Sequence, residues 1–364
     1  MTLQGTDICD PAHRRTRGRA SLHALLARYV GGSRTLCEQE LIDALFVEAG
    51  DGTGWLTGIC ELSVSFPGGG PVRIRSLSEI LQRRRLEPAL ATAGLRWGTE
   101  MFRSVSSYGC GSYDAALFRE IYETVYMRDV AGPAPLFRFG IASEFGGGSP
   151  TLKVYFDLYA VKAGRRRHTL ERIADLLGET ASLNAWKREC PDIDQNKSRV
   201  IGIDFGAGDA VRTKFYWGAR PLTWESIVAA SREISGERHI TTLRCLEREV
   251  FRAAGELSSI LISNCGVNGA RSMKLDLCVA RLYGNDGEAY DAIERFRGAT
   301  VRRDGSSPLK LINGGLEPSR TRCVQQYLGV ELPPERDPRV TIYYRPIGLE
   351  TEHLNPVLRP RMCA

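Results

Sequence analysis

A short strand-like pattern recurs along the chain, and its spacing limits the folds that the sequence can adopt. The segment LKVYFD alternates Lys153, Tyr155 and Asp157 with apolar side chains. This alternation puts polar groups on one face of a β-strand and apolar groups on the other. The pattern returns in VRTKFYW and SMKLDLC, where Lys214 and Lys274 follow Lys153 at intervals of 61 and 60 residues. Such a period suits one large supersecondary unit.

Each recurring strand follows another strand-like segment across a turn rich in Gly, Pro, Asn or Asp, which predicts five antiparallel hairpins. The first strands of these hairpins are expected at residues 60–66, 137–145, 200–205, 257–262 and 324–330. Helix-like segments are expected at about residues 111–128, 168–188, 222–254 and 284–299. The order predicts an α+β fold in which a ten-stranded antiparallel β-barrel with a central active site is surrounded by α-helices.

Periodicity also predicts which strand face points inward. The apolar face would pack against the helices, whereas the lysine, arginine and tyrosine side chains would converge in the lumen. Burying a cation without a partner or water would cost several kcal/mol of folding free energy. We therefore expect the lumen to hold water and an anion. An open sheet with a solvated polar face is the alternative. The expected outward residues are Val154, Phe156, Phe215, Trp217, Leu275 and Leu277.

The expected lumen suits the chemistry of an allylic diphosphate. Its cations could neutralise a diphosphate, and its tyrosines could stabilise a neighbouring carbocation by about 0.5–2 kcal/mol each while excluding water. Because the sequence has no DDxxD-like acidic cluster, we expect protein cations to replace metal ions and no cofactor to be needed. The candidate cations are Arg73, Lys153, Arg212, Lys214 and Lys274, and the candidate tyrosines are Tyr155, Tyr216 and Tyr343.

The segments CELSVSF, VRIR, LKVYFD, VIGIDF with VRTKFYW, and RVTIYYRP, taken in this order, resemble a known family. It is the soluble aromatic prenyltransferases of the ABBA fold, in the dimethylallyltryptophan synthase branch, and the likeness covers about residues 55–346. The resemblance implies a prenyltransferase barrel (PT barrel) of five ααββ repeats. It also implies metal-independent transfer of a dimethylallyl group to an indole ring, as tryptophan or a tryptophan-derived metabolite. The chain length is closer to that of bacterial members.

The resemblance also implies roles for individual residues. Glu61 falls on the glutamate that accepts the proton of the indole N–H, although it could instead be a strand residue paired with Arg73. Arg73 falls on the diphosphate-binding arginine better than Arg75 does. The other residues that match the family's cation and tyrosine-shield positions are Lys153 with Tyr155, Arg212 and Lys214 with Tyr216, and Tyr343; Tyr327 on the ninth strand is a further shield candidate.

The fourth repeat departs from the fungal pattern. Lys274 and Asp276 stand where fungal members tend to carry neutral Gln and Tyr. Lys274 is still a candidate ligand of the diphosphate, whereas the role of Asp276 is left open. The difference could change how the diphosphate or the acceptor lies in the lumen.

Composition sets further expectations. With 364 residues, 43% of them hydrophobic and 25% charged, the chain can bury one large core. We expect residues 1–19 to form a disordered basic arm and residues 20–364 to form a single barrel domain, as a monomer or a homodimer. No apolar run is long enough for a membrane span or a secretory signal, so we expect a soluble, cytoplasmic protein. The ten scattered cysteines and five histidines indicate neither a zinc site nor a disulfide framework.

Other functions remain open at this point. The acceptor could be tyrosine, a phenol or a peptide instead of an indole. From a different class, the chain could be a non-catalytic barrel that sequesters a phosphorylated metabolite. The net charge of +6 permits an anionic partner, but no aromatic-rich RNA-binding signature accompanies the basic runs. We therefore expect a prenyl diphosphate and an aromatic small molecule as partners, with no nucleic acid and no membrane.

Overall fold

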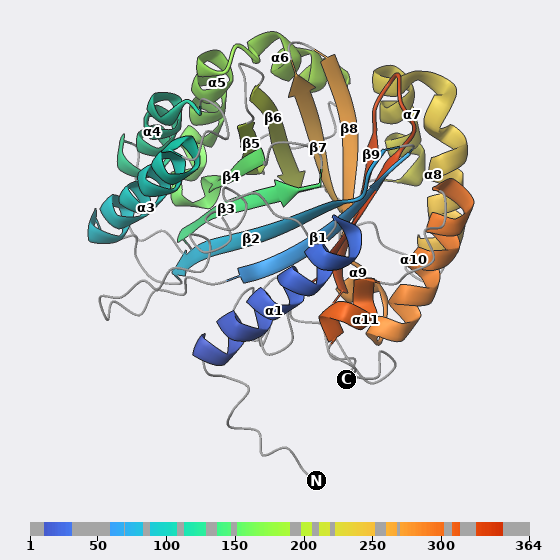
Figure 1. Ribbon diagram of the computed structural model, residues 1–364. Coiled ribbons are helices and arrows are strands. Elements are labelled where there is room, and N and C mark those ends of the chain that lie inside the picture. The colour runs from blue at the N-terminus through green and yellow to red at the C-terminus, as the bar shows by residue number, and fades with distance from the viewer. Residues whose placement is uncertain are drawn as a thin grey trace, which may run out of the picture.

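Ten antiparallel strands close into a barrel in the computed structural model of the chain (Figure 1). Around the barrel the strand order is β1-β10-β9-β8-β7-β6-β5-β4-β3-β2, so each strand pairs with its neighbours in sequence and β10 pairs with β1. The structure describes residues 11–30, 59–68, 70–82, 88–107, 113–128, 137–146, 151–189, 198–205, 211–218, 223–251, 260–267, 270–301, 308–313 and 325–344.

Consecutive strands form hairpins, as the turn signals predict, and all five hairpin turns lie at one end of the barrel because every odd-numbered strand runs in the same direction. We call this end the turn end. The strands are β1 (Ile59–Pro67), β2 (Arg73–Gln82), β3 (Phe137–Phe145), β4 (Thr151–Asp157), β5 (Ser198–Phe205), β6 (Val211–Gly218), β7 (Ile260–Val267), β8 (Ala270–Leu277), β9 (Gln325–Leu332) and β10 (Arg339–Tyr344).

Strand β7 corrects one prediction. We expected a strand at 257–262 followed by the turn SNCGVNGA, because Ser, Asn and Gly favour turns. The strand instead begins at Ile260 and continues to Val267, where it pairs with Ala270. Its pairing with β6 and β8 extends through the polar segment. The ladder hydrogen bonds of two neighbouring strands therefore override the local turn preference.

Helices cover the outside of the barrel and separate its hairpins (Figure 1). Thr223 caps helix α7, because its side chain accepts a hydrogen bond from the Ser226 N–H. The helices are α1 (Pro11–Tyr29), α3 (Pro88–Ser107), α4 (Ala115–Glu123), α5 (Arg166–Leu176), α6 (Thr180–Glu189), α7 (Trp224–Ser235), α8 (Ile240–Leu246), α9 (Val279–Leu282), α10 (Asp286–Thr300) and α11 (Pro308–Asn313).

Two predicted helical segments are each divided by a glycine with positive φ. Gly178 lies between α5 and α6 at φ +68°, and Gly236 follows α7 at φ +66°. Glycine adopts this left-handed conformation without the steric cost that other residues meet, so it ends a helix readily. Helix α1 is a further difference, because it begins at Pro11, inside the arm expected to be disordered. Residues 1–10 of that arm lie outside the described residues.

Helix α3 was not predicted, and its glycines explain why. Gly94 and Gly98 lower its helix propensity, yet both lie against aromatic rings of α4. A Cβ atom at Gly98 would lie 2.2 Å from Cζ of Phe118, and one at Gly94 would lie 2.3 Å from the hydroxyl oxygen of Tyr122. The glycines therefore allow α3 to approach α4 closely, a tertiary requirement that local sequence does not reveal.

The apolar core lies between the barrel and its helices. The six side chains predicted to point outward are all buried in it. Trp217 of β6 stacks on Trp186 of α6 with ring centroids 5.2 Å apart, and Phe156 of β4 lies 6.2 Å from Phe118 of α4. Among the described helices, none has the length and apolar character required to cross a membrane.

We predict that Gly98→Ala lowers the free energy of unfolding by about 1–3 kcal/mol, because the new methyl group overpacks the interface with Phe118. This loss should exceed the gain of about 1 kcal/mol from the helix propensity of alanine. Urea denaturation would measure it. Gly164→Ala is the matched control, because a Cβ atom there meets nothing within 4 Å. Equal urea midpoints for the two variants would contradict the packing explanation.

Candidate active site

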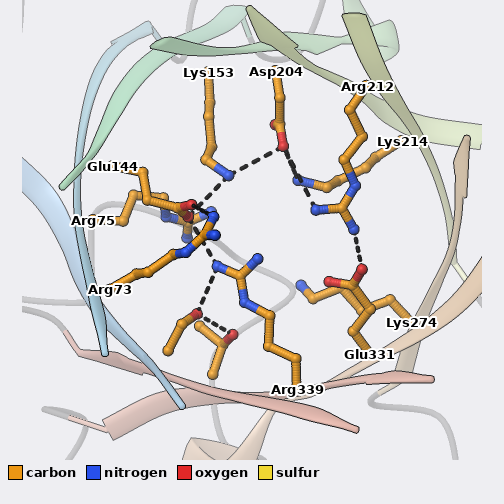
Figure 2. A network of polar contacts seen from close by, with 12 residues as sticks. Arg73, Arg75, Glu144, Lys153, Asp204, Arg212, Lys214, Lys274, Glu331 and Arg339 are labelled. Atoms are coloured by element: carbon orange, nitrogen blue, oxygen red, sulfur yellow. Dashed lines mark hydrogen bonds and ion pairs between the residues drawn. The ribbon is translucent and has the colours of Figure 1, made fainter. Parts of the chain in front are cut away.

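The lumen of the barrel contains a network of buried charges (Figure 2). Lys153 of β4, Lys214 of β6 and Lys274 of β8 are only 3–6% exposed. Alternation along each strand turns these lysines inward while their apolar neighbours face the helices. The predicted convergence of the recurring lysines is therefore confirmed.

Carboxylates on the odd-numbered strands pair with Lys153 and Lys214, and the sequence patterns did not predict them. Asp204 of β5 lies between these two lysines, with its Oδ2 atom 3.1 Å from Lys153 Nζ and 2.9 Å from Lys214 Nζ. Glu144 of β3 lies 3.0 Å from Lys153 Nζ. The expectation of unpaired lumen cations is therefore wrong for these two lysines. Alternation along the first strand of a hairpin could have indicated these carboxylates. In β5, for example, Gly202 and Asp204 share the face opposite Ile201 and Ile203.

Arginines extend the network toward the turn end. Arg73 and Arg339 each donate to Glu144 at 3.0 Å. Arg212 donates to Glu331 of β9 and lies 3.8 Å from Asp204. Arg339 and Glu331 were not among the predicted site residues. We define the charge ring as the five cations Arg73, Lys153, Arg212, Lys214 and Arg339 with the three carboxylates Glu144, Asp204 and Glu331.

The charge ring keeps its carboxylates ionised. Burial acts to raise the pKa of Asp204, but Lys153 and Lys214 outweigh it and hold that pKa well below its usual value. Lys153 and Arg339 likewise outweigh the burial of Glu144 and lower its pKa. With five cations against three ionised carboxylates, the ring has an excess of positive charge that an anion could neutralise.

Arg75 lies deeper in the lumen than Arg73, whose side chain is 38% exposed. The Arg75 guanidinium donates to Glu61 at 2.6 Å and to the hydroxyl of Tyr155 at 2.5 Å, and it lies 4.8 Å from the ring centroid of Tyr343. Burial opposes its charge, but Tyr155, Tyr343 and Glu61 raise its pKa well above the usual value. The alternative prediction that Glu61 pairs with Arg73 is wrong, because Glu61 pairs with Arg75 and Arg73 pairs with Glu144.

The four predicted tyrosines form two pairs. Tyr155 and Tyr216 have ring centroids 6.3 Å apart, and those of Tyr327 and Tyr343 are 6.4 Å apart. Gly202 makes room for the first pair, because a Cβ atom there would lie 3.1 Å from both rings. Arg75 lies near the rings of Tyr155 and Tyr343, and Lys274 near those of Tyr216 and Tyr343, so the structure brings the predicted shield residues together in one part of the lumen.

Lys274 lies among the tyrosines rather than in the charge ring. Its Nζ atom donates to the hydroxyl of Tyr343 at 2.6 Å and to Asp276, and it lies 6.0 Å from the ring centroid of Tyr216. Burial would lower its pKa, but Asp276 and Tyr343 raise it above the usual value. This lysine therefore joins the predicted cation and tyrosine positions into one connected site.

The described residues contain no group of three or more His, Cys, Asp or Glu side chains placed to hold a metal ion. The lumen carboxylates are instead bound to lysine and arginine. What this arrangement can do chemically is bind an anion at the turn end and place aromatic faces beside it.

Solved structures share this fold. PriB, a prenyltransferase solved with the product diphosphate, is 20% identical at a TM-score of 0.70 and aligns over 94% of this chain and 96% of its own. The 6-dimethylallyltryptophan synthase of Micromonospora olivasterospora is 15% identical at a TM-score of 0.73, covering 94% and 98% of the two chains. The 5-dimethylallyltryptophan synthase of Streptomyces coelicolor is 20% identical at a TM-score of 0.67, covering 96% and 98%.

The predicted likeness to dimethylallyltryptophan synthases is therefore confirmed at the level of the fold. No protein-family model matches the sequence, and the comparison with curated proteins finds no match either. The antiparallel barrel with outer helices is common to the chain and these structures over almost their whole lengths.

The charge ring predicts how stability depends on pH. Burial acts against the charge of Glu331, but Arg212 and Arg339 lower its pKa from 4.5 to about 2. Its stabilisation, on the order of 3 kcal/mol, is fully present above pH 4.5 and is lost as the pH falls toward 2. We expect the urea midpoint to fall across this window, and to fall less steeply in Glu331→Gln. Glu100→Gln, at an exposed position, should keep the steep dependence; identical slopes for the two variants would disprove this role of Glu331.

Proposed function

We propose that the chain is an aromatic prenyltransferase that transfers a dimethylallyl group from dimethylallyl diphosphate to the indole ring of tryptophan or a tryptophan-derived metabolite. This proposal rests on one observation, the order in which cations, tyrosines and a glutamate are arranged along the lumen. The charge ring, with its excess of positive charge, lies at the turn end, and the four tyrosines lie next to it along the lumen. Glu61 lies beside the tyrosines and accepts a hydrogen bond from Arg75. Each group suits one step of the transfer.

The charge ring would bind the diphosphate of the donor. Lys153, Lys214 and Arg212 would donate to its oxygens, and Arg73 would close the turn end. Lysine and arginine neutralise the negative charge that develops on a leaving diphosphate, a form of electrostatic stabilisation that usually contributes most to the rate. The carboxylates of the ring hold these cations in place before the donor arrives, so the donor meets a preorganised site.

The tyrosines would surround the dimethylallyl group. The C–O bond of the donor breaks, its electron pair leaves with the diphosphate, and the planar cation lies between aromatic faces. Tyr155, Tyr216 and Tyr343 would supply these faces and exclude water, with Tyr327 behind Tyr343. Lys274 would orient Tyr343 through its hydroxyl and would contribute positive charge toward the diphosphate.

Glu61 would position the acceptor. Its carboxylate would accept the proton of the indole N–H, which raises the electron density of the ring that attacks the cation. A π-electron pair of the ring then forms the new C–C bond to the cation. The ring carbon would give its proton to the released diphosphate, which restores aromaticity, and Glu61 would return the N–H proton to the indole nitrogen. Arg75 would keep Glu61 ionised and oriented, because it donates to Oε1 of that glutamate.

The solved structures support the choice of substrates. PriB has been solved with L-tryptophan and dimethylallyl thiolodiphosphate, and the 5- and 6-dimethylallyltryptophan synthases with tryptophan and DMASPP. We infer further that the chain is one barrel domain over residues 20–364, built from five ααββ repeats. Helices lie between successive hairpins in support of this. We also infer that the transfer needs no metal ion, since lysine and arginine can take its electrostatic role.

The deciding experiment is mass spectrometry of the purified protein after incubation with dimethylallyl diphosphate and a panel of acceptors. The panel holds tryptophan, tyrosine, cyclic dipeptides and simple phenols, each with and without EDTA. We expect tryptophan to gain one prenyl unit in both conditions. A product only from tyrosine, a phenol or a peptide would refute the indole acceptor, and a loss of product in EDTA would refute metal independence. Binding of the thiolodiphosphate without any product would indicate a non-catalytic barrel.

We predict that Glu61→Gln lowers kcat roughly 10²–10⁴-fold while the affinity for dimethylallyl thiolodiphosphate changes little. Lys214→Met should have the opposite effect, because its main consequence should be a lower affinity for the donor. Single-turnover kinetics and calorimetric titration separate the two effects. If Glu61→Gln weakened donor binding as much as Lys214→Met does, Glu61 would not have an acceptor-specific role.

A further inference from the structure

Asp276 occupies a position that tyrosines hold on two other strands. Two residues after its lysine, β4 has Tyr155 and β6 has Tyr216, whereas β8 has Asp276. The sheet register supports the equivalence, because Tyr155 pairs with Gly202 of the following strand and Asp276 with Gly329. A carboxylate that is only 5% exposed therefore lies in the lumen, next to the ring of Tyr343 across Gly329.

The two oxygens of Asp276 have different environments. Lys274 Nζ binds Oδ1, whereas Oδ2 is buried and has no hydrogen-bond partner among the described residues. A buried carboxylate oxygen without a donor is unfavourable, and in native proteins such a group calls for an explanation. The unsatisfied oxygen thus indicates that a hydrogen-bond donor is missing beside Tyr343 and Lys274.

The prenyl donor does not supply that group. Its diphosphate is an anion, which a carboxylate repels, and its dimethylallyl chain has no N–H or O–H. The missing donor therefore belongs to the acceptor, whose indole N–H is already assigned to Glu61. In an amino-acid acceptor the remaining strong donor is the α-ammonium group.

The barrel already contains the geometry that this contact requires. Oδ2 of Asp204 lies 3.1 Å from one lysine ammonium and 2.9 Å from another, those of Lys153 and Lys214. One buried carboxylate can therefore bind two ammonium groups here. Asp276 has one such partner in Lys274, and the adjacent ring of Tyr343 attracts cations, with Lys274 Nζ 5.0 Å and Arg75 Cζ 4.8 Å from its centroid.

We propose that Oδ2 of Asp276 binds the α-ammonium group of the acceptor, so that the enzyme selects an indole that carries a free primary amine. The proposal rests on the proposed function and deepens it, because it separates free tryptophan from N-acylated and cyclic-dipeptide acceptors. Gly329 permits this arrangement. A Cβ atom there would lie 2.8 Å from Oδ1 of Asp276 and 2.9 Å from the Tyr343 ring, so a larger residue would displace the carboxylate.

The test compares acceptors that differ only in their charged groups. Calorimetric titration in the presence of dimethylallyl thiolodiphosphate measures the affinity for tryptophan, tryptamine and indole-3-propionate, and kcat/KM is measured with dimethylallyl diphosphate. Asp276→Asn should lower the affinity for tryptophan and tryptamine roughly 10–100-fold, and the loss of kcat/KM should come mainly from KM. The affinity for indole-3-propionate should change less than about twofold. Glu331→Gln is the matched control, because it changes a carboxylate on the neighbouring strand that is only 13% exposed, and it should affect the three acceptors equally.

Three results would overturn the proposal. Asp276→Asn could weaken all three acceptors equally, it could leave the affinity for tryptophan unchanged, or it could lower kcat for every acceptor with unchanged affinities, which would indicate proton transfer. If Asp276→Asn does not fold, the wild-type chain still decides, because N-acetyltryptophan should bind roughly 10–100-fold more weakly than tryptophan. A wild type that prenylates both compounds equally refutes only this inference, whereas one that prenylates no indole refutes the proposed function.

Discussion

The shared ion pair of Asp204 with Lys153 and Lys214 is the interaction on which the rest of the lumen depends. Closing a sheet of ten strands forces the inward side chains of every strand into one enclosed space. Because this sequence places a lysine on three of those strands, closure would bring like charges together in a medium that screens them poorly. Asp204 lies on the strand between two of the lysines and forms ion pairs with both at about 3 Å. Glu144 and Glu331 do the same for the flanking arginines.

This arrangement separates the lumen into regions with different chemistry. The charge ring lies near the hairpin turns, and the tyrosines lie beyond it, where Gly202 lets two rings approach the strand between them. Arg75 connects the regions, since its guanidinium contacts Glu61, Tyr155 and the face of Tyr343. An anion and an aromatic molecule can therefore bind next to each other without competing for the same side chains. Ordering of this kind is what transfer of a cationic group between them requires.

The inward-facing residues were predicted better for the second strand of a hairpin than for the first. The lysines and tyrosines of β4 and β6 repeat in plain alternation, so their inward face could be predicted. Glu144 and Asp204 are each the single acidic residue of their strand, so no repeated pattern indicates them. The long helix α3 was missed for a related reason, because its glycines are chosen for contact with α4 rather than for helix propensity. In both cases the residue type is set by contact with another strand or helix rather than by the local sequence pattern.

The alternation of side chains by itself determined which residues of each strand face inward, since successive side chains of a strand must point to opposite faces. It also determined the antiparallel hairpins, because their turn residues are local. Only the tertiary structure decided the partners. Arg75 rather than Arg73 binds Glu61, and Ser65 meets Thr341 across 276 residues of chain. The choice between the arginines depends on the register of β1 and β2, in which Arg75 lies opposite Ser63 and Arg73 opposite Ser65. The contact of Ser65 with Thr341 depends on the register at which β1 meets β10 and closes the barrel, and a register between distant strands follows from packing of the whole sheet rather than from any local pattern.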